Sequence, residues 1–198
     1  MSGGGAFYKN YLIAKQDNYF ILEVDYYSQF VQKNLTKHQY IIGDVHNKYM
    51  FRDDLFDVIL LFEVIEHVHN PFRAINNCAK WLKPGGRLII SAPQYWHIHG
   101  WPSDYFRYTA LGLKELAKTA KLDVIDSWPM GGPCVLIWCA IKLNFRLLQL
   151  PIIDWLITTP FLLLARLGDL VFFRNKNKDF SLDTRGWIIV LQKAKSDY

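Results

Sequence analysis

Residues that could bind a small ligand follow three short apolar runs of the chain. Asp25 and Asp44 each end one run, and Phe62 and Glu63 follow a third run, Phe56–Leu61. If the runs are neighbouring parallel strands, these residues meet at the carboxyl edge of a sheet, where ligands bind in such folds. A carboxylate at that edge can accept two hydrogen bonds at once. The spacing therefore predicts a binding site for a polar small molecule.

A second group of residues with chemical capability lies in the stretch 93–109. It combines His99, Asp104 and Tyr105 with many aromatic side chains. Histidine exchanges a proton near neutral pH, so His99 could act as a base or orient a hydroxyl group. The aromatic side chains would exclude water and hold a ring or a sugar. The alternative is that Asp104 pairs with Arg107 and only keeps this segment folded.

Alternating strands and helices must hold these two groups of residues in place. The expected strands are Phe20–Val24, Tyr40–Gly43, Phe56–Leu61, Arg87–Ser91, Leu122–Ser127 and Trp187–Gln192. The expected helices are Ala6–Lys15, Ser28–Thr36, Pro71–Leu82 and Ala110–Ala120. Apolar strands that alternate with helices predict an α/β domain with a mostly parallel sheet that is covered on both faces. The turn Pro84-Gly85-Gly86 would separate a helix from the strand that follows it.

The chain resembles the class I methyltransferases that use S-adenosyl-L-methionine (SAM), and in particular the small type 11 family. The motifs that carry the resemblance are Gly43-Asp44, the strand Phe56–Leu61, Glu66-His67-Val68 and Leu82-Lys83-Pro84-Gly85-Gly86. The resemblance covers residues 3–132 and 184–193. It implies a Rossmann-like α/β fold with strand order 3-2-1-4-5-7-6, an antiparallel seventh strand, and an apolar helical insertion before that strand.

The resemblance also implies that SAM is the cofactor. The residues that it assigns to cofactor binding are Gly3, Gly5, Asp25, Asp44, Val45, Phe62 and Glu63. Asp25 would bind the ribose hydroxyl groups, and Asp44 would accept a hydrogen bond from the adenine amine. Glu23 competes with Asp25 for the first role, and a simple Asx turn is the alternative for Asp44.

The implied reaction is methyl transfer to an oxygen of a small-molecule, sugar or lipid-like acceptor, with His99, Asp104 and Tyr105 as candidate catalytic residues. The cofactor supplies the reactivity and the protein positions the reactants, so no metal ligands are expected. Two other functions stay open. One is a catalytically inactive binding or assembly protein, and the other is a quinone or isoprenoid methyltransferase at a membrane.

The family's first strand normally precedes the glycine-rich turn, whereas this chain begins at that turn, with Met1 in place of the first family glycine. The resemblance therefore implies a sequence that is truncated at its N-terminus and a sheet that lacks its first central strand. We expect two neighbouring strands to lose their shared partner and SAM binding to be weak or undetectable.

The stretch 133–173 is strongly apolar and contains Pro151 and Pro160. No part of it reaches the about 18 uncharged apolar residues that a membrane span requires. We expect short helices, divided by the prolines, that contact a second subunit, a membrane or a lipid-like acceptor, or that pack on the domain itself. The adjacent basic cluster 174–178 would suit anionic lipid headgroups. The expected organisation is a methyltransferase core (1–132), this insertion (133–178) and a terminal strand that completes the sheet (179–198).

Composition limits the class of protein further. The chain has 198 residues, of which 51% are apolar and 21% charged, as in a folded domain rather than a disordered one. The net charge of +5 is scattered and lacks the aromatic and basic patterning of a nucleic-acid surface, so we expect no nucleic-acid partner. The three cysteines fit neither a zinc site nor a disulfide framework, which predicts a cytoplasmic protein, with or without membrane association.

Overall fold

The computed structural model of the chain describes residues 20–23, 39–147, 151–174 and 183–195. Its strands are β1 (Phe20–Glu23), β2 (Gln39–Ile42), β3 (Phe56–Phe62), β4 (Leu82–Pro93), β5 (Leu122–Pro129) and β6 (Gly186–Lys193). Its helices are the short 3-10 helix η2 (Ile65–His67), α3 (Pro71–Trp81), α4 (Ala110–Thr119), α5 (Pro133–Leu147) and α6 (Pro151–Arg174). The expected helices Ala6–Lys15 and Ser28–Thr36 lie outside the described residues.

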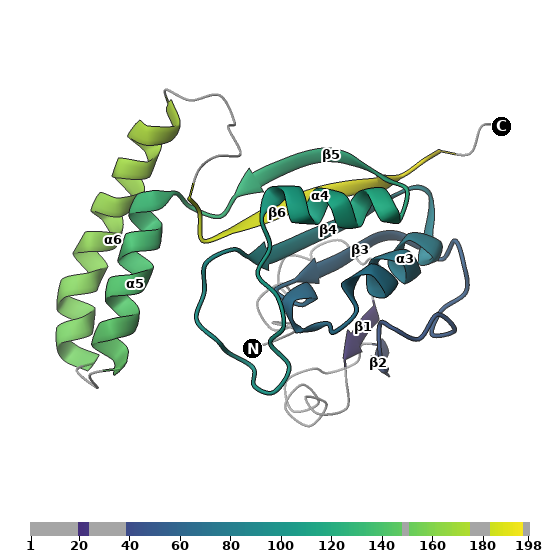
Figure 1. The fold of residues 1–198 in the computed structure, drawn as a ribbon, viewed down its shortest axis with the longest axis horizontal. Coiled ribbons are helices and arrows are strands. Elements are labelled where there is room, and N and C mark those ends of the chain that lie inside the picture. The colour runs from purple at the N-terminus through teal and green to yellow at the C-terminus, as the bar shows by residue number, and fades with distance from the viewer. Residues whose placement is uncertain (1–19, 24–38, 148–150, 175–182, 196–198) are drawn as a thin grey trace.

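The strands form two sheets (Figure 1). Strands β3, β4, β6 and β5 form a four-stranded sheet in that order, and β1 pairs with β2 in a separate parallel sheet. Strands β3 and β4 are parallel, whereas β6 runs antiparallel to both of its neighbours. The predicted Rossmann-like α/β fold is confirmed. In the family's strand numbering the small sheet has the order 3-2 and the large sheet 4-5-7-6, and no described strand joins the two.

Strand β4 begins directly after α3, earlier than the predicted strand Arg87–Ser91. Phe56 of β3 lies opposite Leu82, and Val58 lies opposite Arg87, so the Lys-Pro-Gly-Gly segment bulges out of the ladder. Glycine is required in this bulge, because a Cβ on Gly86 would stand 2.8 Å from the carbonyl oxygen of Lys83. The glycines therefore make a bulge within a strand rather than a turn in front of it.

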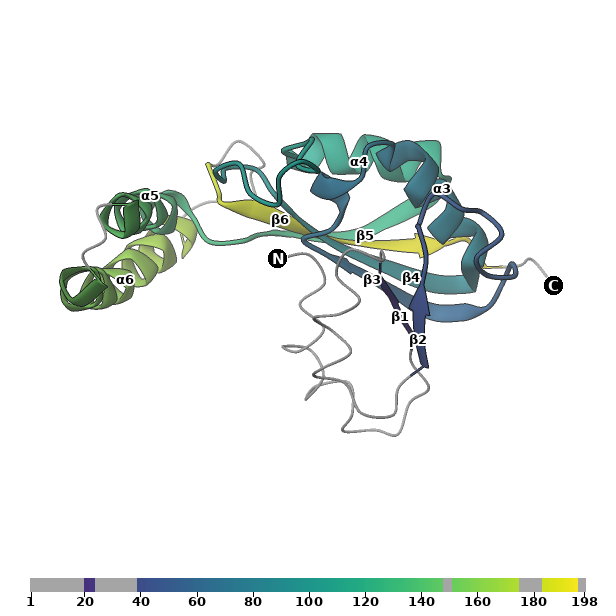
Figure 2. The same ribbon diagram turned by 90° about the horizontal axis from the view of Figure 1, so that it is seen from below.

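Helices α3 and α4 cover one face of the four-stranded sheet (Figure 2). Each helix begins with a side-chain cap. The Asn70 side chain accepts a hydrogen bond from the N–H of Arg73, and the Thr109 hydroxyl accepts one from the N–H of Gly112, both at 3.1 Å. The fully buried residues between helices and sheet include Ile75, Leu88, Leu113, Ile189 and Leu191. This core fixes the strand ends from which the loops of the site depart.

Helices α5 and α6 pack against each other as a hairpin beside one end of the large sheet (Figure 1). The buried carboxylate of Asp169 on α6 accepts hydrogen bonds from the N–H groups of Gly132, Cys134 and Val135 at 2.6, 3.0 and 3.3 Å. A carboxylate is favoured at this place because the first N–H groups of a helix lack intrahelical partners and carry partial positive charge. Helix α6 thus caps the start of α5.

Pro160 does not end a helix, contrary to the expectation that the prolines divide this stretch into short helices. Proline inside a helix removes one hydrogen bond and crowds the preceding turn, at a cost of about 3 kcal/mol. Packing along α5 opposes this cost, since Ala165 is buried and Gly168 lies close to Cys134. Among the described residues, no helix combines the length and hydropathy that a membrane span needs.

Candidate functional site

The loop 94–109, between β4 and α4, extends beyond the carboxyl ends of β3 and β4 (Figure 1). Arg107 holds this loop closed. Its guanidinium group forms two hydrogen bonds with the Asp104 carboxylate, at 2.6 and 2.8 Å. It also donates to three backbone carbonyl oxygens, those of Trp96, His97 and Phe106. One side chain therefore joins the two ends of the loop.

Asp104 is the buried half of this ion pair, with a side chain that is 2% exposed. The hydrogen bond from the Arg107 side chain holds the pKa of Asp104 far below its ordinary value, so the carboxylate stays ionised. Its second oxygen also accepts a hydrogen bond from the N–H of His99 at 2.7 Å. The pairing of Asp104 with Arg107, one of the two alternatives from the sequence, is present. A catalytic role for Asp104 stays a prediction.

The ring of His99 is 18% exposed and faces η2. Its Nδ1 atom lies 3.2 Å from the carbonyl oxygen of His97, so the tautomer that satisfies this carbonyl carries its proton on Nδ1. Burial lowers the pKa of His99 despite this hydrogen bond and the nearby Asp104. The ring is therefore neutral near pH 7, with a free electron pair on Nε2.

Glu66 in η2 is fully buried and contacts the same loop. Its backbone carbonyl accepts hydrogen bonds from the N–H groups of Tyr105 and Phe106 at 2.9 and 3.2 Å. Neither oxygen of its carboxyl group has a hydrogen-bond partner in the described part of the chain. Burial raises the pKa of Glu66 to about 7. No role was predicted for Glu66 from the sequence, in which the adjacent pair Glu66-His67 was the only signal for one.

Tyr105 has an exposed side chain, and its backbone is anchored to η2 by the hydrogen bond to Glu66. The ring lies 6.5 Å from the ring of His69, measured between centroids. The structure thus brings His99 and Asp104 into contact, whereas Tyr105 is joined to Glu66 through its backbone. The catalytic role of Tyr105 stays a prediction.

Glu63 stands at the end of β3 with a φ of 52°, a left-handed conformation that is uncommon outside glycine. Its N–H donates to the carbonyl oxygen of Ser91, and the Ser91 hydroxyl donates to Glu63 Oε1 at 2.8 Å. Backbone strain of this kind clusters at binding sites, where neighbouring contacts enforce it. The backbones of Phe62 and Glu63 lie at the carboxyl edge of the sheet, as expected, and their contact with a cofactor stays a prediction.

Asp44 follows β2 and forms the Asx turn that was the alternative to a binding role. Its Oδ1 atom accepts hydrogen bonds from the backbone N–H and the ring of His46, at 2.8 and 2.6 Å. Burial opposes ionisation of Asp44, but the hydrogen bonds from His46 outweigh it, and the pKa is lowered. The carbonyl oxygen of Val45 accepts from the side chain of Asn77 at 2.8 Å. The turn is therefore tied to α3.

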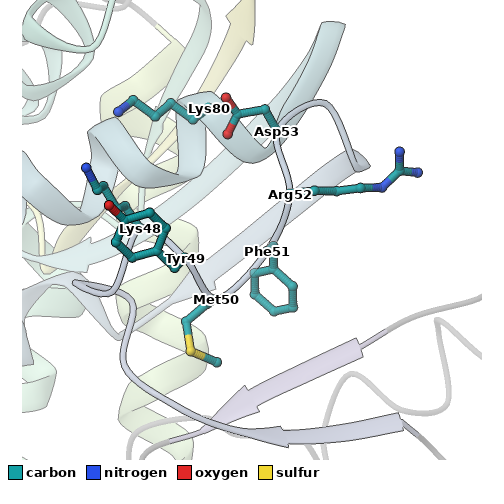
Figure 3. A pocket seen from close by; sticks show the side chains of 7 residues that line it. All are labelled: Lys48, Tyr49, Met50, Phe51, Arg52, Asp53 and Lys80. Atoms are coloured by element: carbon teal, nitrogen blue, oxygen red, sulfur yellow. The ribbon is translucent and has the colours of Figure 1, made fainter.

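The other predicted site residues, Gly3, Gly5 and Asp25, lie outside the described residues. A surface hollow of about 550 Å³ is present elsewhere, beside the carboxyl end of α3 (Figure 3). Its lining residues are Lys48, Tyr49, Met50, Phe51, Arg52, Asp53 and Lys80. The backbone N–H groups of Asp54 and Leu55 donate to the last carbonyl groups of α3. Strand β3 begins just after Leu55 and strand β4 just after α3, so this hollow lies at the amino ends of both strands. Ligands bind at the opposite edge in such folds.

Gly100 packs directly against the site. It has a φ of 67°, and a Cβ atom there would stand 2.9 Å from Cε1 of His67. We expect Gly100→Ala to destabilise the chain by about 1–2 kcal/mol because of the left-handed backbone. The close contact with His67 should add to this loss. Gly112→Ala is the matched control. A Cβ at Gly112 meets nothing closer than 3.5 Å, so this helical change should be neutral or stabilising. Equal urea unfolding curves for both variants would contradict this packing.

The chain is similar to known proteins in sequence. Residues 2–90 match the family model described as a methyltransferase domain. A ubiquinone biosynthesis O-methyltransferase of Coxiella burnetii is 53% identical over 36 residues, which are 18% of this chain and 15% of that protein. This chain therefore aligns with a small part of the curated relatives that it matches.

Solved structures share the fold. A methyltransferase of Haloferax volcanii, in complex with its Trm112 activator, aligns with a TM-score of 0.62 and 18% identity, over 98% of this chain and 79% of that one. Phosphoethanolamine N-methyltransferase 2 of Haemonchus contortus, solved with S-adenosyl-L-methionine, aligns with a TM-score of 0.56 and 17% identity, over 98% of this chain and 46% of that one.

Proposed function

We propose that this chain, which belongs to the class I methyltransferases and uses SAM as its cofactor, transfers a methyl group to an oxygen of a small-molecule acceptor. The observation that carries the proposal is the closed loop 94–109. This loop holds the neutral ring of His99 beside the buried Glu66, beyond the carboxyl ends of β3 and β4. Both groups can accept a proton, and a hydroxyl group must lose its proton when it is methylated.

The residues at this edge suit the cofactor chemically. In the described part of the chain, the hydrogen bonds of the Asp44 carboxylate go to Oδ1, so Oδ2 can accept from the exocyclic amine of an adenine. The backbones of Val45, Phe62 and Glu63 supply further polar groups at the same edge. When bound, SAM supplies an electrophilic methyl group on a positively charged sulfur.

The chain itself must position the acceptor and take up its proton. His99 would receive the proton at Nε2 or hold the hydroxyl group in line. The pair Asp104–Arg107 would act through position, because Asp104 binds the backbone N–H of His99 and Arg107 binds the carbonyl oxygen of His97. Loss of this pair would displace His99 from Glu66.

The surface of the loop favours an apolar acceptor. Its large apolar side chains are unusually exposed, from 36% for Phe106 to 84% for Trp101, and comprise Tyr95, Trp96, Ile98, Trp101, Tyr105 and Phe106. A contiguous exposed apolar surface commonly marks a ligand or partner site. A phenolic, ring-bearing or lipid-like hydroxyl compound fits this surface better than a highly charged one.

Transfer of a radiolabelled methyl group from SAM tests the proposal. Phenols and catechols serve as acceptors, and the corresponding anilines serve as matched nitrogen acceptors. We expect label in the hydroxyl compounds and little in the anilines. Labelling of the anilines alone would contradict oxygen transfer. SAM binding without transfer to any acceptor would favour the inactive binding or assembly protein.

The exposed leucines of α6 support a second part of the proposal, contact with an anionic lipid surface. Leu163, Leu164, Leu167 and Leu170 are 58–66% exposed. Their spacing places them on one side of the helix. The alternative that this insertion only adds to the core predicts that Leu162, Leu163 and Leu164 are mostly buried. Leu162 is half-buried, whereas Leu163 and Leu164 are exposed, which supports an external contact. The sequence continues into the basic cluster 174–178, and basic residues beside an apolar face suit anionic headgroups.

We expect the double variant Leu163→Gln/Leu167→Gln to bind anionic vesicles at least about tenfold more weakly, because each leucine contributes about 1.5–3 kcal/mol on burial. Leu111→Gln on α4 is the matched control, since Leu111 is 68% exposed and lies on another surface. Flotation with vesicles measures binding. A wild-type chain that does not float would refute lipid contact, and a dimer in light scattering that the double variant abolishes would assign the leucines to a subunit interface instead.

A further inference from the structure

We propose that Glu66, His67 and His99 form a binding site for a divalent metal ion of the zinc class. The three side chains come from η2 and from the loop 94–109, and each offers one ligand atom. These three atoms all lie within 4.8 Å of one another. No metal ligands were expected from the sequence, because SAM itself supplies the reactivity for methyl transfer.

The separations approach those of a metal centre. Glu66 Oε1 lies 3.7 Å from Nε2 of His67 and 3.9 Å from Nε2 of His99. Ligand atoms around a tetrahedral zinc ion, with bonds of about 2.0–2.1 Å, are about 3.4 Å apart. The three atoms are separated by up to 4.8 Å, so inward rotation of the side chains would be needed to close the set around an ion. The observed distances are also too long for direct hydrogen bonds between these groups.

Both histidines are arranged to present Nε2 as an electron-pair donor. His67 Nδ1 lies 2.5 Å from the carbonyl oxygen of Ser103, and His99 Nδ1 lies 3.2 Å from that of His97. A proton on Nδ1 satisfies each carbonyl, and Nε2 is then unprotonated. Histidines that bind metals commonly donate their other ring N–H to a carbonyl or carboxylate in this way.

The polar groups of the cluster lack partners. In the described part of the chain, the buried side-chain nitrogen and oxygen atoms without a hydrogen bond are Glu66 Oε1, Glu66 Oε2 and His67 Nε2. An unpaired buried polar atom is costly, and an unpaired buried carboxylate more so. A cation at this point would satisfy all three atoms and compensate the charge of Glu66.

The three ligand groups indicate the class of ion, and they leave one of its four coordination positions open. Two imidazoles and one carboxylate are a common ligand set of catalytic zinc, which keeps a fourth position for water or substrate. The rings of His67 and His99 are 12% and 18% exposed, so the cluster is reachable from the loop side. If the proposed function holds, on which this step rests, the open position would take the acceptor hydroxyl and lower its pKa. The hydroxyl would then lose its proton to solvent or to the second carboxylate oxygen of Glu66, and His99 would hold the ion through Nε2 instead of taking up the proton itself.

Titration of the full 198-residue chain with Co²⁺ tests the site without SAM or acceptor. We expect a single equivalent to give the visible absorption of four-coordinate Co²⁺, and Zn²⁺ to displace it. His99→Ala should weaken Zn²⁺ binding, measured by calorimetry, by about a hundredfold or more, since loss of a residue that merely orients a ligand already costs about 10- to 100-fold. His97→Ala is the control, because His97 is an exposed histidine on the same loop.

Glu66→Gln separates metal binding from folding. This variant keeps the side-chain shape and removes a buried charge, so the metal-free protein should be at least as heat-stable as wild type while its Zn²⁺ affinity falls. Absence of Co²⁺ and Zn²⁺ binding by the wild-type chain would overturn the proposal. So would Zn²⁺ affinities of His99→Ala and Glu66→Gln equal to that of His97→Ala. None of these readings depends on methyl transfer, so failure of the proposed function would leave the metal site standing.

Discussion

Replacing Arg107 with alanine should destabilise the chain by about 3 kcal/mol, because it leaves the carboxylate of Asp104 buried without its charge partner. Breaking a fully buried ion pair costs about 3–5 kcal/mol. The side chain of Asp104 is 2% exposed but that of Arg107 is 24% exposed, so we expect the lower value. The same change removes the hydrogen bonds to the carbonyl oxygens of Trp96, His97 and Phe106. Urea unfolding followed by circular dichroism measures the loss.

The exposed pair Lys83–Asp57 provides the control for this experiment. Its side chains are 45% and 79% exposed, so Lys83→Ala should cost no more than about 1 kcal/mol. Arg107→Lys should fall between the two, because lysine keeps the charge and loses the two-pronged geometry. If Arg107→Ala and Lys83→Ala unfold at the same urea concentration, the ion pair does not hold the loop 94–109.

Replacing His99 with alanine should lower the rate of methyl transfer by about 100- to 10,000-fold, the usual contribution of a positioned acid or base. The ring of His99 is kept neutral by burial, and its Nε2 atom faces Glu66. Because His99 is assigned to the acceptor, we expect kcat to fall while the affinity for SAM is unchanged. Steady-state kinetics with labelled SAM and calorimetry of SAM binding measure the two quantities.

His97→Ala is the matched change, since His97 lies on the same loop with an exposed side chain. It should retain activity close to wild type. Two results would remove His99 from the reaction: activity of His99→Ala comparable to that of His97→Ala, or a loss of SAM affinity as large as the loss of rate.

The strands of the large sheet could be predicted because buried strands consist of continuous apolar residues, which are visible in the sequence. The run Phe56–Leu61 is continuous and apolar, and it is bounded by polar turns, so β3 was placed to within one residue. The limits of β4 were harder to predict. The segment Lys83–Gly86 reads as a turn, and only its pairing with β3 shows that the strand passes through it as a bulge.

At Pro160, packing between helices outweighs the local preference of proline against a helix interior. Proline disfavours a helix interior, and the prediction of short helices followed from that preference. The contacts between α5 and α6 decided the outcome, with Asp169 capping α5 from a distant part of the sequence. Contacts of this kind have no signature in the local sequence.

The candidate site could be predicted only in part, because some of its contacts depend on the backbone. The loop with His99, Asp104 and Tyr105 was visible as a dense run of chemically capable residues. The approach of Glu66 to His99 was not, because it depends on the path that Arg107 imposes on the loop through backbone carbonyl groups. Backbone acceptors are the same in every sequence, so no residue pattern reports them.

Photo-crosslinking of radiolabelled SAM to the 198-residue chain, followed by peptide mapping, tests the central claim most directly. At saturating SAM, the account predicts label in the peptides that contain Asp44 and Val45 or Phe62 and Glu63, and loss of this label with excess S-adenosylhomocysteine. Labelling that S-adenosylhomocysteine does not prevent, or competed labelling confined to α5 and α6, would contradict SAM binding at the carboxyl edge of the sheet.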